Sequence, residues 1–385
     1  MGRHRPAPST VLICTRFTLK GIPVNFKRFG RPAVVAVVAA LALSSCAANE
    51  GGSSDTASDS TLSGTMNAGG ASSQQAAQEA WIATFQTNNP DVTINYDPSG
   101  SGAGREAFIA GGSAFAGSDS YLKDDELTGE FGSCAVDTKA VDLPVYISPI
   151  AVIFNVEGVD DLNMDAETLA KIFKGDITAW DDAAIVALNP DASLPSTAIT
   201  AVHRSDDSGT TKNFTDYLNQ NVPDVWDKSA ADPFPYQSGE GAQGTSGVVS
   251  AVTNGVGTIG YADASQAGEL GVAKIKVGDT FVQYSAEAAA EVVAGSPAVE
   301  GREANDLALD LNRKTTNAAE YPLVLVSYAV VCTEYADPAV AELVKAYVGF
   351  MAGAEGQAEA ADKAGAAPLS PELQDKVAAV IETIK

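Results

Sequence analysis

Residues 203–214 read HRSDDSGTTKNF, and this stretch is the clearest indication of the fold. A run with β-branched residues, Ala198–His203, leads into it, and a helical pattern, Lys212–Asn221, follows it. Gly and hydroxyl residues therefore stand where a strand gives way to a helix. Free N–H groups and the positive end of the helix dipole make such a turn a candidate anion site.

Two other turns have the same composition, AGGASSQQ at residues 68–75 and DPSGSGAGREAF at residues 97–108. Ser, Thr and Asp at a helix start are also ordinary N-caps, which explain any one of these turns taken alone. Three such turns in one chain, one of them led by Arg204, favour a site for a small oxyanion.

The remaining pattern alternates short strands with amphipathic helices, which predicts an α/β fold. The expected strands are Leu62–Met66, Val92–Tyr96, Leu143–Asn155, Ala198–His203, Thr258–Tyr261 and Leu323–Val331. The expected helices are Gln74–Gln86, Ala166–Phe173, Lys212–Asn221, Thr245–Asn254 and Ala339–Met351.

The charge of the chain is strongly negative and unevenly distributed. In 385 residues, 24 Lys and Arg stand against 49 Asp and Glu, a net charge of −25. Residues 1–45 hold seven basic residues and no acidic one, so the rest has 17 basic and 49 acidic residues, a net charge of −32. Such a chain repels polyanions, which argues against a nucleic-acid partner.

The basic N-terminal part has the plan of a secretory signal peptide. Lys27, Arg28 and Arg31 precede the apolar run Ala33–Leu43, and the motif LSSC ends at Cys46. The motif resembles the lipobox of bacterial lipoproteins, in which the Cys is lipidated. We therefore predict a signal peptide over residues 1–45, with translation starting at Val24, and lipidation of Cys46. Residues 46–60 are rich in Gly, Ser and Asp and are expected to form a tether reaching roughly 20 Å.

Two cysteines, Cys134 and Cys332, remain once the signal and Cys46 are set aside. A pair of cysteines in an exported chain is more often a disulfide than a metal site. We therefore predict a disulfide and no metal.

Two glycine patterns, at residues 239–244 and 255–260, fit G-x-G-x-x-G. The first follows a Pro-rich loop and the second leads into a strand, so a dinucleotide site is not supported, and no P-loop motif occurs. We expect no cofactor.

Several motifs together resemble the substrate-binding protein of bacterial high-affinity phosphate ABC transporters. They are AGGASSQ, YDPSGSGAG, AFAGSDSYL, ETLAKIFKGDITAWDDAAIVALNP, HRSDDSGTTKNF and GTIGYA, in this order. The resemblance implies a two-lobed periplasmic-binding-protein fold of type II, each lobe a central mixed sheet flanked by helices. Two crossover strands, Leu143–Val156 and Tyr321–Cys332, would form the hinge. Lobe I would contain residues 61–150 and 323–385, and lobe II residues 151–322.

The resemblance also implies the phosphate contacts. They would come from Ser72, Ser73, Ser101, Asp119, Arg204, Ser208, Gly209 and Thr210. Asp206 either holds the Arg204 guanidinium or is a solvated turn acid, while Asp207 departs from the family pattern and would weaken affinity if it pointed inward. An ionised carboxylate only accepts hydrogen bonds, so Asp119 would accept a proton that phosphate carries and sulfate lacks.

Other functions remain as alternatives. A binding protein for sulfate or molybdate is the closest one, and Asp119 argues against it. A hydrolase would need a triad such as Ser72, His203 and Asp119, but no G-x-S-x-G motif is present, and His203 should face away if Arg204 faces the cleft. The expected protein is a non-enzymatic monomer, lipid-anchored on the extracytoplasmic face of the cell membrane, that delivers phosphate to an ABC permease.

Overall fold

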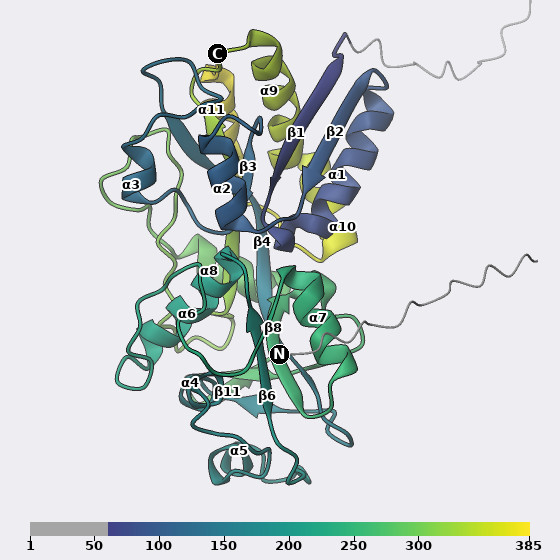
Figure 1. Ribbon diagram of the computed structural model, residues 1–385, viewed down its shortest axis with the longest axis vertical. Helices are drawn as coiled ribbons and strands as arrows, with labels where there is room; N and C mark the ends of the chain where they lie inside the picture. The colour runs from purple at the N-terminus through teal and green to yellow at the C-terminus, as the bar shows by residue number, and fades with distance from the viewer. Residues whose placement is uncertain (1–60) are drawn as a thin grey trace, which may run out of the picture. The chain divides into compact units, whose positions relative to one another are not determined.

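The computed structural model describes residues 61–385. One long strand, β4 (Ala140–Asn155), runs through the middle of this part of the chain (Figure 1). It contains most of the predicted first crossover, and fifteen of its sixteen residues are buried. Strands covered on both faces need apolar side chains throughout, which is why the run LPVYISPIAVIFNV forms this strand.

β4 changes its hydrogen-bonding partner along its length. The first part, as far as Pro149, pairs antiparallel with β12 (Val324–Cys332). The second part, from Ile150, pairs antiparallel with β8 (Thr258–Asp263). Proline has no backbone N–H to donate, so Pro149 suits the place where one ladder ends. The two ladders belong to two lobes, and the predicted two-lobed α/β architecture is confirmed.

Lobe I lies on the β12 side of β4. Its strands run in the order β2-β1-β3-β12-β4, and β12 is antiparallel to its neighbours. Besides β4 and β12, lobe I contains β1 (Gly64–Gly70), β2 (Val92–Asp97), β3 (Ala116–Ser118), η1 (Ser72–Gln74), α1 (Gln75–Asn88), α2 (Ser101–Ile109), α3 (Asp124–Leu127), α9 (Pro338–Ala352), α10 (Ala354–Ala364) and α11 (Pro371–Thr383). Trp81 joins these helices to the sheet, because its indole donates to the Gly356 carbonyl of α10 and its ring meets Tyr146 of β4 edge-on.

Lobe II lies on the β8 side. Its strands run in the order β4-β8-β6-β7, with β9 also paired to β4, and three further strands form the separate sheet β11-β10-β5. The elements are β5 (Asn163–Met164), α4 (Ala166–Lys174), α5 (Ala183–Leu188), β6 (Thr200–Arg204), α6 (Gly209–Asn221), β7 (Glu240–Ala242), α7 (Gly244–Asn254), η2 (Ala264–Gln266), β9 (Gly271–Val272), β10 (Lys274–Val277), β11 (Thr280–Val282) and α8 (Ala286–Ala294).

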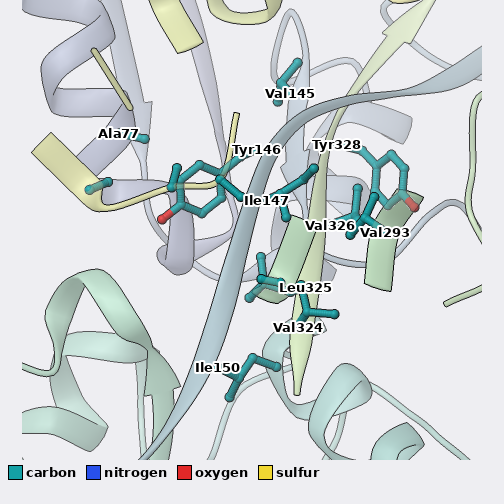
Figure 2. Close-up of a cluster of buried hydrophobic side chains, with 14 of the residues drawn as sticks. Ala77, Val145, Tyr146, Ile147, Ile150, Val293, Val324, Leu325, Val326 and Tyr328 are labelled. Carbon is teal, nitrogen blue, oxygen red and sulfur yellow. The ribbon is translucent and has the colours of Figure 1, made fainter. Parts of the chain in front are cut away.

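A buried apolar cluster surrounds the part of β4 that pairs with β12. Figure 2 shows Val145 and Ile147 of β4 with Leu325 and Val326 of β12, and Val293 of α8 beside them. Complete burial of a Val, Ile or Leu side chain contributes roughly 1.5–3 kcal/mol. β4 belongs to both lobes, and packing in this cluster therefore stabilises its position.

The chain between α8 and β12 has no regular secondary structure and lies partly against lobe I. The Leu307 N–H donates to the Asp142 carbonyl at 2.9 Å, and Arg302 donates to the Leu122 carbonyl. The assignment of residues 151–322 to lobe II stays a prediction. The hydrogen bonds of Arg302 and Leu307 join residues 302–307 to lobe I.

Two predicted boundaries differ from the structure for a local reason. Strand β1 extends to Gly70 instead of ending at Met66, because the glycines let the neighbouring backbones approach closely. A Cβ at Gly70 would lie 2.0 Å from the Gly117 carbonyl oxygen, and Gly70 has a φ of 138°. Helix α6 begins at Gly209 and not at Lys212, because the Ser208 side chain caps it by accepting from the Thr211 N–H at 3.2 Å.

The predicted disulfide between Cys134 and Cys332 is confirmed. It joins the loop before β4 to the end of β12, so both cysteines lie in lobe I. Among residues 61–385, none of the helices has the length and apolar character needed to cross a lipid bilayer. The signal peptide, Cys46 and the tether lie outside the described residues.

Candidate functional site

Several helix starts meet where the two lobes face each other. Helices η1, α2, α6 and α7 follow strands β1, β2, β6 and β7, and Asp119 follows β3. β1 is parallel to β2 and β3, and β6 is parallel to β7. Parallel strands end at the same edge of their sheet, which is where α/β proteins bind ligands. The two lobes thus present their ligand-binding edges to one another.

Lobe I contributes Ser72, Ser73, Ser101 and Asp119, all of them buried. The hydroxyls of Ser72 and Thr245 of lobe II are hydrogen-bonded at 3.0 Å. Ser73 Oγ donates to Asp119 Oδ1 at 2.6 Å, and the Asp119 N–H donates to Ser101 Oγ at 3.1 Å. These bonds give the hydroxyl groups of three separate turns fixed positions.

Lobe II contributes the start of α6, which approaches lobe I closely. Thr210 Oγ1 donates to Asp119 Oδ2 at 2.9 Å. A Cβ at Gly209 would lie 2.6 Å from Asp119 Cβ and 2.7 Å from Ser101 Oγ, so only glycine fits there. The lobes are therefore closed on each other at this helix start.

Arg204 lies at the end of β6 with a side chain that is 2% exposed. Its guanidinium donates to both carboxylate oxygens of Asp206, with Nε to Oδ1 at 2.8 Å. Asp206 also accepts from the Gly244 N–H at 3.0 Å. Burial favours the neutral carboxyl, but the bonds and charge of Arg204 outweigh it and lower the pKa of Asp206. Asp206 thus holds the Arg204 side chain in place and is not a solvated turn acid.

Asp119 is the buried carboxyl group at the centre of these contacts. Burial raises its pKa, while hydrogen bonds from Ser327, Ser73 and Thr210 act in the opposite direction and favour the ionised form. The positive charge of Arg204 also favours the ionised form. Hydrogen bonds from these hydroxyl groups stabilise the ionised form of Asp119 inside the closed site.

Asp207 and His203 both face away from this cluster. The Asp207 side chain is exposed, and its backbone carbonyl accepts from the Gly102 N–H of lobe I at 2.9 Å. The His203 ring stacks on Phe234 at 3.9 Å and is hydrogen-bonded to the Arg204 carbonyl. The Asp207 side chain therefore does not point inward, and His203 is not assembled with Ser72 and Asp119 into a triad.

Three residues of the cluster were not identified from the sequence: Thr245, Ser327 and Asn213. Thr245 is the second residue of α7 and directly follows the GEGAQG segment, which contains β7 and is a fourth strand-to-helix turn of small residues. That composition was a usable signal. Ser327 donates to Asp119 Oδ1 from the middle of β12, and Asn213 donates to the Asp119 carbonyl from within α6. No local pattern marks Ser327, whereas Asn213 lies within the HRSDDSGTTKNF motif but was not singled out there.

Comparison with known proteins places the chain in a family. Residues 55–355 match the description "PBP superfamily domain". The phosphate-binding protein PstS 3 of Mycobacterium tuberculosis is 36% identical over 375 residues, which cover 94% of this chain and 100% of that protein. The phosphate-binding protein PstS 2 of the same organism is 33% identical with the same coverage.

Solved structures show the same fold. A high-affinity periplasmic phosphate-binding protein, PfluDING, solved with bound phosphate, superposes with a TM-score of 0.67 at 22% identity, covering 82% of this chain and 93% of its own. The phosphate-binding protein from Stenotrophomonas maltophilia has a TM-score of 0.59 at 19% identity and the same coverage. With the full-length sequence matches, this establishes that the chain belongs to the PBP superfamily and, within it, to the family of PstS phosphate-binding proteins.

Proposed function

We propose that this protein binds inorganic phosphate between its closed lobes and delivers it to a membrane ABC permease for import. One observation supports this proposal most directly. Around a single carboxylate, Asp119, lie Arg204, the start of α6 and buried hydroxyl groups from both lobes. The curated relatives, matched over their whole length, carry the name phosphate-binding protein.

The donors suit a small tetrahedral anion. Arg204 presents a planar fork with a full positive charge, and Asp206 fixes its orientation. The start of α6, a helix of 13 residues, offers the N–H groups of Gly209 and Thr210 and the positive end of its dipole. The hydroxyls of Ser72, Ser101 and Ser208 and the backbone N–H of Ser73 complete the proposed contacts. Hydrogen bonds to a charged group contribute about 1.5–3 kcal/mol each, so seven or eight support at least micromolar binding.

Asp119 supplies selectivity among oxyanions. Its carboxylate accepts a hydrogen bond from a protonated phosphate oxygen, whereas sulfate has no proton to offer at neutral pH. A sulfate ion would bring its lone pairs against those of Asp119 in a buried site, where unpaired polar groups are costly. The same argument disfavours molybdate.

Transport suits this site better than hydrolysis. His203 stacks on Phe234, and the site has a charged anchor for an anion instead of an activated nucleophile. We infer that Cys46 is lipidated, that the protein is a monomer held at the extracytoplasmic face of the membrane, and that the closed form docks on the permease.

Calorimetric titration of the ligand-stripped protein tests the proposal. Phosphate and arsenate should bind with micromolar or tighter affinity, and sulfate should give no measurable heat. Tighter binding of sulfate than phosphate would contradict the proposed ligand, and turnover of a chromogenic phosphate ester would contradict the proposed transport role.

A further inference from the structure

A buried carboxylate of lobe II is held by lobe I outside the proposed phosphate contacts. Asp232, in the chain between α6 and β7, has 1% of its surface exposed. Its Oδ2 lies 2.7 Å from Arg105 Nη2 and 2.9 Å from Lys123 Nζ, and its Oδ1 accepts from Ser120 Oγ at 2.8 Å. Arg105 is in α2, and Ser120 and Lys123 lie between β3 and α3, so all three partners belong to lobe I.

Both ends of this contact are joined to the phosphate site. The Asp232 carbonyl accepts from the N–H of Ser208, the cap residue of α6, at 3.1 Å. On the other side, Arg105 Nη1 donates to Ser118 Oγ at 3.0 Å, and Ser118 directly precedes Asp119. The carboxylate of Asp232 is thus bound by lobe I while its backbone positions the helix start that faces phosphate.

The electrostatics favour an ionised pair in the closed form. Burial opposes the charge of Asp232, but Arg105 and Lys123 outweigh it and hold its pKa far below the ordinary value. Arg105 also binds Glu126 of lobe I through Nε, at 3.1 Å to each carboxylate oxygen. Arg105 therefore binds two carboxylates, Glu126 of its own lobe through Nε and Asp232 of the opposite lobe through Nη2.

We infer that Asp232, Arg105, Lys123 and Ser120 form an interlobe latch that sets how long the closed protein retains its ligand. The inference rests on the proposed phosphate function. The latch exists only while the lobes are closed, because its members come from opposite lobes. Opening must separate Asp232 from its three partners before phosphate leaves, whereas capture by the open form does not involve these contacts. The latch consequently slows release and leaves the rate of capture almost unchanged.

The test measures release of radiolabelled phosphate from the full-length protein into excess unlabelled phosphate. Close interfacial charge pairs have coupling energies equivalent to roughly tenfold or more in a rate or equilibrium constant. Asp232→Asn should therefore speed release about tenfold or more, with an association rate within about twofold of wild type. Lys123→Gln should speed release less, since the Lys123 side chain is 44% exposed.

Glu126→Gln is the matched control, because it removes the other carboxylate that Arg105 binds, and that carboxylate lies within lobe I. Release should stay within about twofold of wild type. Unchanged release in both Asp232→Asn and Lys123→Gln would overturn the latch. Equal acceleration by Asp232→Asn and Glu126→Gln would also overturn it, because the effect would then come from lobe I alone.

A second measurement separates the latch from the proposed ligand. If the wild-type protein bound no phosphate, the proposed function would fail. Small-angle X-ray scattering of the ligand-free proteins would still test the latch, because it measures how far the lobes are apart. A larger radius of gyration for Asp232→Asn than for wild type and Glu126→Gln supports the latch. Equal radii for all three proteins, combined with absent phosphate binding, overturn it.

Discussion

Asp119 is a buried acid in a site proposed to bind an anion, and it is surrounded by hydrogen-bond donors. It is a carboxyl group buried at 4% exposure, and hydroxyl groups from Ser73, Ser327 and Thr210 donate to it. The donors come from η1, β12 and α6, so both lobes stabilise the charge of Asp119. A protonated ligand oxygen adds another donor, whereas an unprotonated anion adds only repulsion.

Replacing Asp119 by Asn should relax the choice between phosphate and sulfate. The amide donates as well as accepts, so sulfate gains a partner and phosphate loses its acceptor. Sites that require a hydrogen bond discriminate by on the order of 10⁴-fold, and most of that factor should be lost. Calorimetric titration with both anions measures it. Asp207→Asn, a change at an exposed acid near Arg204 in sequence, should leave selectivity unchanged. An unaltered preference in Asp119→Asn would show that shape and Arg204 alone select the ligand.

Asp263 should make stability depend on pH. It lies at the end of β8 opposite Ile150, and burial raises its pKa to about 7 against the opposing hydrogen bonds of Ser265 and Ser148. Tyr146 donates to its Oδ1 at 3.1 Å, and the negative charge of Asp119 also raises the pKa. Between pH 4 and pH 7 the folded protein therefore keeps a proton that the unfolded chain has lost, so this group's contribution to stability falls as pH rises.

The measurement compares wild type with Asp263→Asn by chemical denaturation at several pH values. The free energy of unfolding of wild type should decline relative to the variant from pH 4 to pH 7, by at most about 1.4 kcal/mol per pH unit. The exposed pair of Asp161 with Lys274 supplies the control, and Asp161→Asn should run parallel to wild type. Parallel curves for Asp263→Asn would mean that Asp263 is ionised in the folded protein.

The start of α6 shows how a secondary-structure element is placed for closure. Ser208 caps the helix, Gly209 passes against lobe I, and Thr210 bonds to Asp119. Local sequence explains the cap, because Ser is a good N-cap residue. The need for glycine next to it comes from lobe I, since in an isolated helix an alanine there would be favourable.

Gly209→Ala should therefore weaken phosphate binding without unfolding the protein. The added Cβ clashes with Asp119 and Ser101 only in the closed form. Overpacking costs about 1–3 kcal/mol, which corresponds to roughly 5- to 150-fold in affinity. Gly247→Ala in α7 is the control, because its Cβ would have ordinary contacts at 3.7 Å. Calorimetry measures affinity and thermal melting measures stability, and full affinity in Gly209→Ala would contradict the closed arrangement of these residues.

The protein as a whole is an acidic body that binds an anion. Residues 46–385 carry a net charge of −32, so the long-range field repels phosphate. Attraction must come from short-range donors in a buried site, where Arg204 is 2% exposed. Buried charges are screened by salt much less than surface charges are.

Phosphate affinity should accordingly change little with ionic strength. We expect less than a threefold change in the dissociation constant between about 50 mM and 500 mM salt, where the Debye length shortens from roughly 14 Å to 4 Å. Calorimetry in sodium chloride tests this expectation, and Asp232→Asn should show the same weak dependence. A loss of affinity of tenfold or more at high salt would mean that exposed surface charges, and not the buried donors, attract phosphate.

The amino-acid sequence by itself determined the α/β class, the strand at Leu143–Asn155, the turns that offer N–H groups, and the family resemblance, and only that resemblance implied that the strand crosses between two lobes. These follow from local patterns: a continuous apolar run, Gly and Ser at helix starts, and the motif around Arg204. Only the tertiary structure decided that Ser327 and Thr210 donate to Asp119, that Thr245 meets Ser72, and that Asp232 lies against Arg105. The partners in these contacts are between 91 and 208 residues apart, and most of them join opposite lobes. Such contacts depend on how two separately folded surfaces meet, which no local pattern of side chains specifies.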